Sequence, residues 1–321
     1  MHKSSRWISF LITATIFLFV LLLPQRQPRD AGAQPSVKSK NVTLVLSGGD
    51  EIFEVDLPRD GDLGKGASSP GKTWEWQARA SKDIPKQLHN AFIMISECKP
   101  VDHGRRLLIT AKEGGTALVN RESRKTEFVT LITTGTPYSG ELLPENRLVF
   151  AVGGKSGRLV GYDLDGVGQP LFNVEFESAH GVHWDAESKT LWAVGFSDIR
   201  SYELTDWKTP KPSLKLIANF ALPKKDGHDL APVPGTKELI VSTGEGVYLF
   251  DTEKKRFKGH PLLGTYAHVK SVSVHPETEK WAYVMPDGEN WWTSRVRFVG
   301  DRNGLIFSNA KLYKARWLVR E

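Results

Sequence analysis

The chain has 321 residues, a net charge of +6 and a hydrophobic fraction of 40%, with 29 glycines, 18 prolines and one cysteine. A single cysteine excludes an intramolecular disulfide, so the fold must be stabilised by its core alone. Residues 1–33 hold four basic and one acidic side chain, and no block of Lys and Arg follows them, which argues against a nucleic-acid partner.

The first 33 residues predict a secretory signal. A basic start precedes an apolar run over residues 7–23, and small residues at 31–33 suit cleavage before Gln34. The run just reaches the length of a membrane-spanning helix, so residues 1–33 are either a cleaved signal peptide or an N-terminal membrane anchor. In both cases we expect an exported protein, periplasmic or extracellular, that contacts a membrane only through residues 7–23 if the segment stays uncleaved.

Residues 34–41 have the polar composition of a linker, and residues 42–321 predict a single all-β domain. The apolar run 42–46 and the alternating run 52–57 are the first expected strands, separated by the turn residues of 47–50. Trp74 and Trp76 then stand two apart, so both rings point to one face of a strand. No segment beyond residue 33 has a convincing helical period.

From Glu97 onward the chain repeats a unit of about 42 residues. Each unit begins with a chemically distinctive residue, which we call the opener, and reaches an apolar strand ten or eleven residues later. The openers are Glu97, Tyr138, His180, His228 and Lys270, spaced by 41, 42, 48 and 42 residues. The apolar strands are expected at 107–112, 148–153, 190–195, 239–244 and 280–285. Four strands in a unit of this length predict the blade of a β-propeller.

Counting the units predicts a six-bladed β-propeller with four-stranded antiparallel blades. One blade covers residues 41–80, four more reach about residue 259, and the last begins at about residue 266. The alternative is a seven-bladed ring in which each end of the domain supplies half a blade. We expect the terminal strands, including 312–319, to pair and close the ring, because closure removes exposed sheet edges.

Four short segments and the C-terminal stretch carry a family resemblance. They are Glu97-Cys98-Lys99-Pro100-Val101 with the following residues 106–111, His180-Gly181-Val182 with Trp184-Asp185, Gly227-His228-Asp229-Leu230, Val269-Lys270-Ser271-Val272-Ser273, and Tyr313-Lys314-Ala315-Arg316-Trp317. With these motifs the chain resembles an uncharacterised family of exported bacterial proteins with a domain of unknown function. The resemblance implies a β-propeller-like fold and export, and it implies no activity. Tyr138-Ser139 departs from the His-Ser pair expected there, which weakens Tyr138 as a site residue.

The openers predict a ligand site, because residues just before the innermost strands of a propeller converge at one mouth of its central channel. Imidazole, amine and phenol donors with one carboxylate suit a small anionic or carbohydrate ligand, such as a sugar, a uronate or an oligosaccharide. The expected ligand-binding residues are Glu97, Tyr138, His180, His228 and Lys270. The side chains expected to stack on sugar faces are Trp184, Trp291 and Trp292. The leading hypothesis is a monomeric, exported binding protein.

Two alternative functions and a purely structural interpretation stay open. The first alternative is a lyase or hydrolase acting on polysaccharide fragments, with a His–Tyr or His–Lys pair as general base and acid. The second is a protein-interaction scaffold. In the structural interpretation the openers only hydrogen-bond the backbone at strand ends. The sequence does not decide whether the protein is an enzyme.

No cofactor is expected, except that a divalent metal ion could assist the enzymatic alternative. His180 and His228 are the candidate ligands, and His183, His268 and Glu97 are further donors of the right chemistry. His183 stands three residues after His180, so alternation predicts opposite faces of one strand for the two rings. The alternation of a basic cluster near the C-terminus favours the solvated face of paired strands, although ring closure could bring its cations to the channel mouth. The cluster consists of Arg295, Arg297, Lys311, Lys314 and Arg316.

Overall fold

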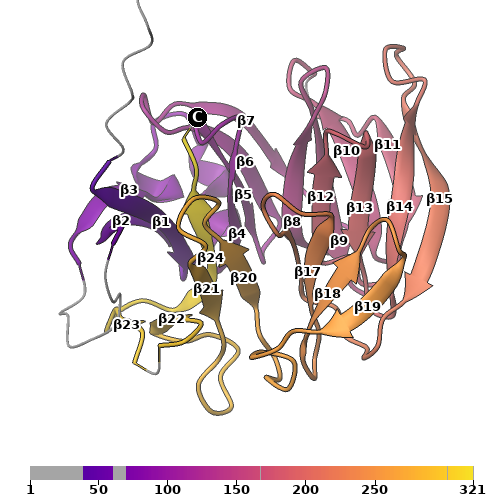
Figure 1. Cartoon of the computed structure of the whole chain (residues 1–321). Helices are drawn as coiled ribbons and strands as arrows, with labels where there is room; N and C mark the ends of the chain where they lie inside the picture. Colours follow the sequence, from indigo (N-terminus) through magenta and orange to yellow (C-terminus); the bar gives the residue numbers. More distant parts are fainter. Residues whose placement is uncertain (1–38, 61–69, 167, 302, 321) are drawn as a thin grey trace, which may run out of the picture. The chain divides into compact units, whose positions relative to one another are not determined.

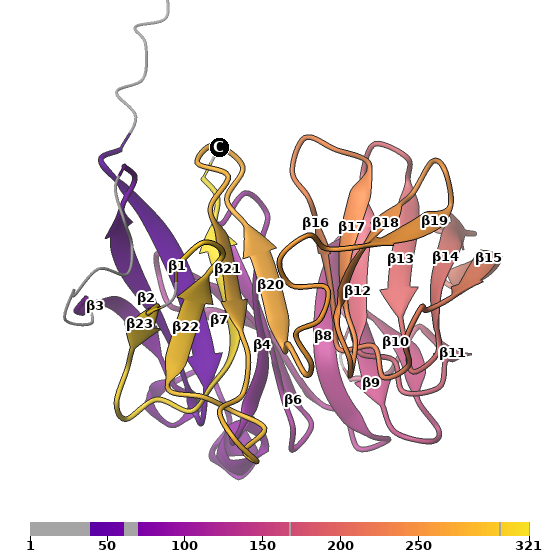
Figure 2. The same ribbon diagram turned by 60° about the horizontal axis from the view of Figure 1, so that its bottom comes forward.

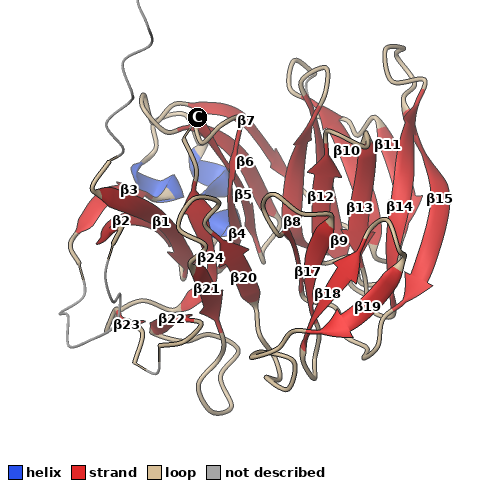
Figure 3. Cartoon of the chain, in the orientation of Figure 1, coloured by secondary structure: helices blue, strands red, loops and turns tan. Residues whose placement is uncertain are grey.

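Strands dominate the computed structural model, which describes residues 39–60, 70–166, 168–301 and 303–320. Within these residues the strands form six four-stranded antiparallel sheets, the blades of a β-propeller (Figures 1 and 3). The prediction of six blades is therefore confirmed over the alternative of seven. The signal peptide or anchor expected over residues 1–33 lies outside the described residues. Among the described residues, no helix combines the length and the apolar character needed to span a membrane.

The first three blades each extend from an inner strand to an outer strand at the rim of the ring. From the inner strand outward, blade 1 consists of β24 (Leu312–Leu318), β1 (Asn41–Gly48), β2 (Glu51–Pro58) and β3 (Lys72–Trp76). Blade 2 consists of β4 (Ile95–Val101), β5 (Arg106–Ala111), β6 (Gly115–Asn120) and β7 (Thr126–Leu131). Blade 3 consists of β8 (Thr136–Leu143), β9 (Arg147–Gly153), β10 (Arg158–Asp163) and β11 (Phe172–Glu175). Two short 3₁₀ helices, η1 (Ala78–Ala80) and η2 (Lys86–Phe92), connect blade 1 to blade 2.

The other three blades follow in chain order. Blade 4 consists of β12 (Gly181–Asp185), β13 (Thr190–Val194), β14 (Asp198–Thr205) and β15 (Ser213–Ala221). Blade 5 consists of β16 (Asp229–Pro232), β17 (Glu238–Ser242), β18 (Val247–Asp251) and β19 (Arg256–Gly259). Blade 6 consists of β20 (Ser271–Val274), β21 (Trp281–Val284), β22 (Arg295–Phe298) and β23 (Leu305–Ile306). The apolar strands expected after the five openers correspond to β5, β9, β13, β17 and β21.

The apolar core of the described residues is divided among the contacts between neighbouring blades. Each of six buried clusters joins two adjacent blades, and the six together go once around the ring. In β5, Leu107 and Ile109 pack towards blade 1, whereas Leu108 packs towards blade 3. The second strand of a blade is thus buried on both faces, which explains why the sequence shows it as an unbroken apolar run.

The ring is closed by the C-terminal strand, as expected. β24 pairs with β1 antiparallel, with Leu44 opposite Trp317 and Leu46 opposite Ala315, so blade 1 contains both ends of the domain (Figure 1). The six inner strands contact one another in the order β24, β4, β8, β12, β16 and β20, and β20 contacts β24 again (Figure 2). All the side chains of β24 are buried. The inner strand of blade 1 therefore depends on the last residues of the chain.

Truncation after Lys311 tests the closure. Without β24, the edge of β1 and the apolar surface between blades 1 and 6 are exposed, so we expect loss of cooperative thermal unfolding. Circular dichroism during heating measures this. Truncation after Leu318 keeps the whole of β24 and is the control, for which we expect a wild-type transition. Equal melting of both truncations would contradict closure by β24.

Candidate functional site

Four of the five openers lie together at one end of the ring. This end, where the inner strands begin, we call the first mouth. The rings of Tyr138 and His180 stack with centroids 3.8 Å apart, and the His180 and His228 rings meet edge to face at 5.4 Å. The Nζ of Lys270 lies 3.0 Å from the Nε2 of His228. An uninterrupted series of contacts thus crosses four consecutive blades, from blade 3 to blade 6.

Burial sets the protonation of these groups. It lowers the pKa of His180 to about 3 and also lowers that of His228, so both imidazoles are neutral at neutral pH. The His180 Nδ1 lies 3.0 Å from the carbonyl oxygen of Ser178, so Nδ1 carries the ring proton and donates a hydrogen bond to this carbonyl. The lone pair on Nε2 can then accept a hydrogen bond from a ligand. Burial lowers the pKa of Lys270 to about 8, so its amine is mostly charged at neutral pH.

Asp226 also lies at the first mouth, although it is not one of the openers. Its Oδ2 lies 3.1 Å from the Nε2 of His228, and that contact lowers the pKa of Asp226 to about 2. Ser178, Asp226 and His268 each stand two residues before an opener, and all three adopt a left-handed backbone with φ of 48°, 66° and 58°. The position two residues before the opener therefore recurs from unit to unit, and this recurrence could have identified Asp226 from the sequence.

Glu97 does not lie in the first mouth, which corrects its assignment as a ligand residue there. A bulge in β4 between Ile95 and Glu97 leaves Ser96 outside the ladder, just as a bulge in β8 leaves out Tyr138. Ser96 is therefore the equivalent of Tyr138, and Glu97 is one residue further along, on the channel-facing side. Its side chain is fully buried. A third bulge, in β24, makes Tyr313 the corresponding residue of blade 1, for which the sequence offered no opener.

Glu97 instead belongs to a buried cluster of four charges in the middle of the ring, which we call the plug. The plug consists of Glu97, Asp229, Lys314 and Arg316, none more than 5% exposed. Arg316 donates to both carboxylates in fork geometry, through Nε and Nη2 to Glu97 (3.0 and 2.8 Å) and through Nη1 and Nη2 to Asp229 (2.9 and 2.6 Å). With a further bond to the carbonyl of Val272, all five N–H groups of the guanidinium are used.

The remaining charge of the plug is Lys314, whose Nζ lies 2.7 Å from the Asp229 Oδ1. Burial alone would raise the pKa values of both carboxyl groups, but the charges of Arg316 and Lys314 lower them below their ordinary values. Two positive and two negative charges make the plug neutral. The interpretation of Lys314 and Arg316 as a solvated face is therefore wrong. Ring closure brings these side chains inward, as in the alternative, but into the plug and not to the channel mouth.

Beyond the plug, the inner strands end at the second mouth. Glu141 lies 3.2 Å from the Lys99 Nζ and 3.8 Å from the His183 Nδ1. A cavity of about 360 Å³ adjoins these residues and is also lined by Trp184 and Trp317. His183 and Trp184 thus lie at the opposite end of the channel from His180. The expectation that Trp184 lies near the openers is corrected, because β12 carries it to the far end of its strand.

The other two tryptophans expected at the site lie on the side of the first mouth. The Trp291 ring contacts the Tyr313 ring with centroids 5.7 Å apart. Trp291 and Trp292 both line a cavity of about 590 Å³ beside the start of β24. Flat apolar surface is therefore present next to the polar groups of the first mouth.

A comparison with protein families found a match over most of the chain. The family model described as "Family of unknown function (DUF6528)" matches residues 59–321. A search of curated proteins found no match.

Replacing Arg316 tests the plug. Arg316→Met leaves two buried carboxylates with Lys314 as their one remaining cation in the plug, so we expect a loss of about 3–5 kcal/mol in the free energy of unfolding. Urea denaturation measures this. Arg105→Met, which removes an exposed partner of Asp102, is the matched control and should cost less than about 1 kcal/mol. Equal effects of the two substitutions would contradict the buried network.

Glu141 predicts a pH dependence of stability. Burial would raise its pKa, but the charge of Lys99 and the interactions with His183 together lower it to about 2, from an ordinary value of 4.5. Because the pKa of Glu141 is lower in the folded protein than in the unfolded chain, its ionised carboxylate stabilises the fold above about pH 5. This contribution to the free energy of unfolding is lost as the pH falls towards 2. Glu141→Gln should therefore be less stable than wild type by about 3 kcal/mol at neutral pH, with the difference shrinking below about pH 4. Urea denaturation across this range measures it, and a difference independent of pH would contradict it.

Proposed function

We propose, from the premise that the chain belongs to the DUF6528 family of unknown function, that the protein binds a small carboxylate-bearing carbohydrate at its first mouth. A uronate or a short oligosaccharide that contains one is the ligand class. The observation that carries this proposal is the continuous contact of Tyr138, His180, His228 and Lys270 across four blades. Because residues 1–33 have the pattern of a signal peptide or an N-terminal membrane anchor, we propose that the binding protein is exported.

The chemistry of each group supports this ligand class. Lys270 supplies a positive charge for a carboxylate, and charge-assisted hydrogen bonds are stronger than neutral ones. The neutral His180 can accept a hydrogen bond from a sugar hydroxyl through its Nε2. Trp291 is 38% exposed and offers a flat face to a sugar ring. A site with one cation, several neutral polar groups and adjacent aromatic surface suits a sugar acid better than an apolar ligand.

Catalysis at the same site is the second candidate, and one contact favours it. The Lys270 amine, with a pKa of about 8, lies 3.0 Å from the imidazole of His228. A base with a pKa near neutrality can remove the proton next to a uronate carboxylate, which is the first step of a lyase reaction. Incubating each bound compound with the protein and following formation of an unsaturated product by ultraviolet absorbance separates the enzyme from the binding protein.

A thermal-shift screen over uronic acids and oligosaccharides tests the binding proposal. A ligand of the first mouth should raise the melting temperature of wild type, since it binds the native state alone. For His180→Ala and Lys270→Met we expect ligand binding to be at least about ten-fold weaker than in wild type. Each substitution removes a hydrogen bond to the ligand, and the one from Lys270 is charge-assisted.

His183→Ala is the matched control, because it removes an imidazole at the second mouth. It should bind the ligand like wild type. Stabilisation that survives both substitutions of the first mouth but disappears in His183→Ala would contradict the proposal and assign the ligand to the cavity beside Glu141.

A further inference from the structure

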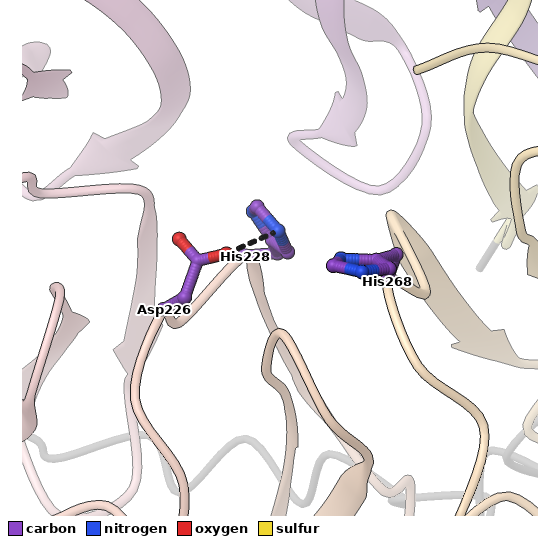
Figure 4. Close-up of side chains that lie close together, drawn as sticks. All are labelled: Asp226, His228 and His268. Carbon is purple, nitrogen blue, oxygen red and sulfur yellow. Dashed lines mark ion pairs between the residues drawn. The ribbon is translucent and has the colours of Figure 1, made fainter. Parts of the chain in front are cut away.

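Three side chains beside the first mouth have the composition of a metal site. Asp226 and His228 come from the segment before β16, and His268 comes from the segment before β20, so that Asp226 and His268 flank His228 (Figure 4). One carboxylate oxygen and two ring nitrogens, one from each residue, all lie within 4.8 Å of one another. We propose that Asp226, His228 and His268 bind one divalent transition-metal ion, with zinc as the reference ion.

The spacing suits such an ion. Zinc–nitrogen and zinc–oxygen bonds of about 2.0–2.1 Å at tetrahedral angles place neighbouring ligand atoms about 3.3 Å apart. The Asp226 Oδ2 and the His228 Nε2 already lie 3.1 Å apart. His268 has to approach by a rotation of its side chain, and its exposure to solvent leaves room for this. Two imidazoles and a carboxylate are the donor set that zinc and its neighbours prefer over calcium or magnesium.

The hydrogen bonding of His228 provides an independent reason. Its Nε2 faces both the Asp226 carboxylate at 3.1 Å and the Lys270 ammonium at 3.0 Å. One ring nitrogen offers either a proton to the carboxylate or a lone pair to the ammonium, so it cannot satisfy both. A metal ion bound by Nε2 and the carboxylate oxygen satisfies both groups and displaces the ammonium.

The backbone fixes two of the ligands where they are needed. Asp226 and His268 both have positive φ angles, a conformation that costs free energy for residues other than glycine. Each is held by a hydrogen bond to the preceding blade, from the Asp226 N–H to Phe196 at 2.7 Å and from the His268 N–H to Gly244 at 3.1 Å. Asp226 is half-exposed, so an ion has access from solvent.

Three protein ligands leave a coordination position open, as in metal sites that bind a further molecule. The carboxylate or a hydroxyl of the bound carbohydrate would occupy this open position on the metal ion. Metal binding itself needs no such ligand, so the inference does not depend on the proposed function. The two are also distinguishable by residue, since Asp226 and His268 serve the metal, whereas His180 and Lys270 serve the carbohydrate.

Isothermal titration with zinc tests the metal site. The full chain, purified without a polyhistidine tag and stripped with a chelator, should bind one equivalent of zinc. Asp226→Asn and His268→Ala should each weaken binding at least about ten-fold, as loss of a direct ligand requires. Lys270→Met should bind zinc at least as tightly as wild type, because it removes a competing positive charge. Magnesium in place of zinc should bind more weakly.

His183→Ala is the control, because His183 also lies beside a carboxylate, that of Glu141. It should bind zinc like wild type, and circular dichroism should show that every variant is folded. The proposal is overturned by a wild type that binds no stoichiometric zinc. It is equally overturned if zinc binding survives in Asp226→Asn and His268→Ala, or if it is lost in His183→Ala.

Discussion

The centre of the molecule depends on two bidentate ion pairs, which the Arg316 guanidinium forms with two buried carboxylates. The guanidinium comes from the last strand of the chain and joins Glu97 on blade 2 to Asp229 on blade 5, 219 and 87 residues away in sequence. A buried charge is tolerated only when its hydrogen-bonding groups are satisfied, and in Arg316 all five N–H groups are. The same contacts that neutralise the plug therefore connect distant blades and hold the closing strand in place.

The plug also determines where function can lie. Because the apolar clusters lie between blades, the middle of the ring is left to polar side chains, and the plug fills it. The channel is consequently divided into two mouths with different chemistry. The first mouth gathers imidazoles, a phenol, an amine and the Asp226 carboxylate, whereas the second has the Lys99–Glu141–His183 group beside Trp184 and Trp317.

The blade repeat gives the first mouth its composition. Equivalent positions in successive units lie next to each other in space, so a side chain at one offset contacts its counterpart in the next blade. His180 and His228 meet in this way, and the residues two positions earlier, among them Asp226 and His268, form a second tier beside them. The proposed ligand and the proposed metal ion therefore share one mouth and His228, while otherwise depending on different residues.

The sequence by itself determined the blade count and the convergence of Tyr138, His180, His228 and Lys270, because strand alternation, apolar runs and a 42-residue period are local properties of the chain. Only the tertiary structure decided which face Glu97 uses, since a bulge of one residue reverses a side chain without changing the apolar pattern. It also decided that Lys314 and Arg316 are buried in contact with Asp229 and Glu97. These contacts exist only once the ring is closed, and closure brings together residues whose separation along the chain carries no local signal.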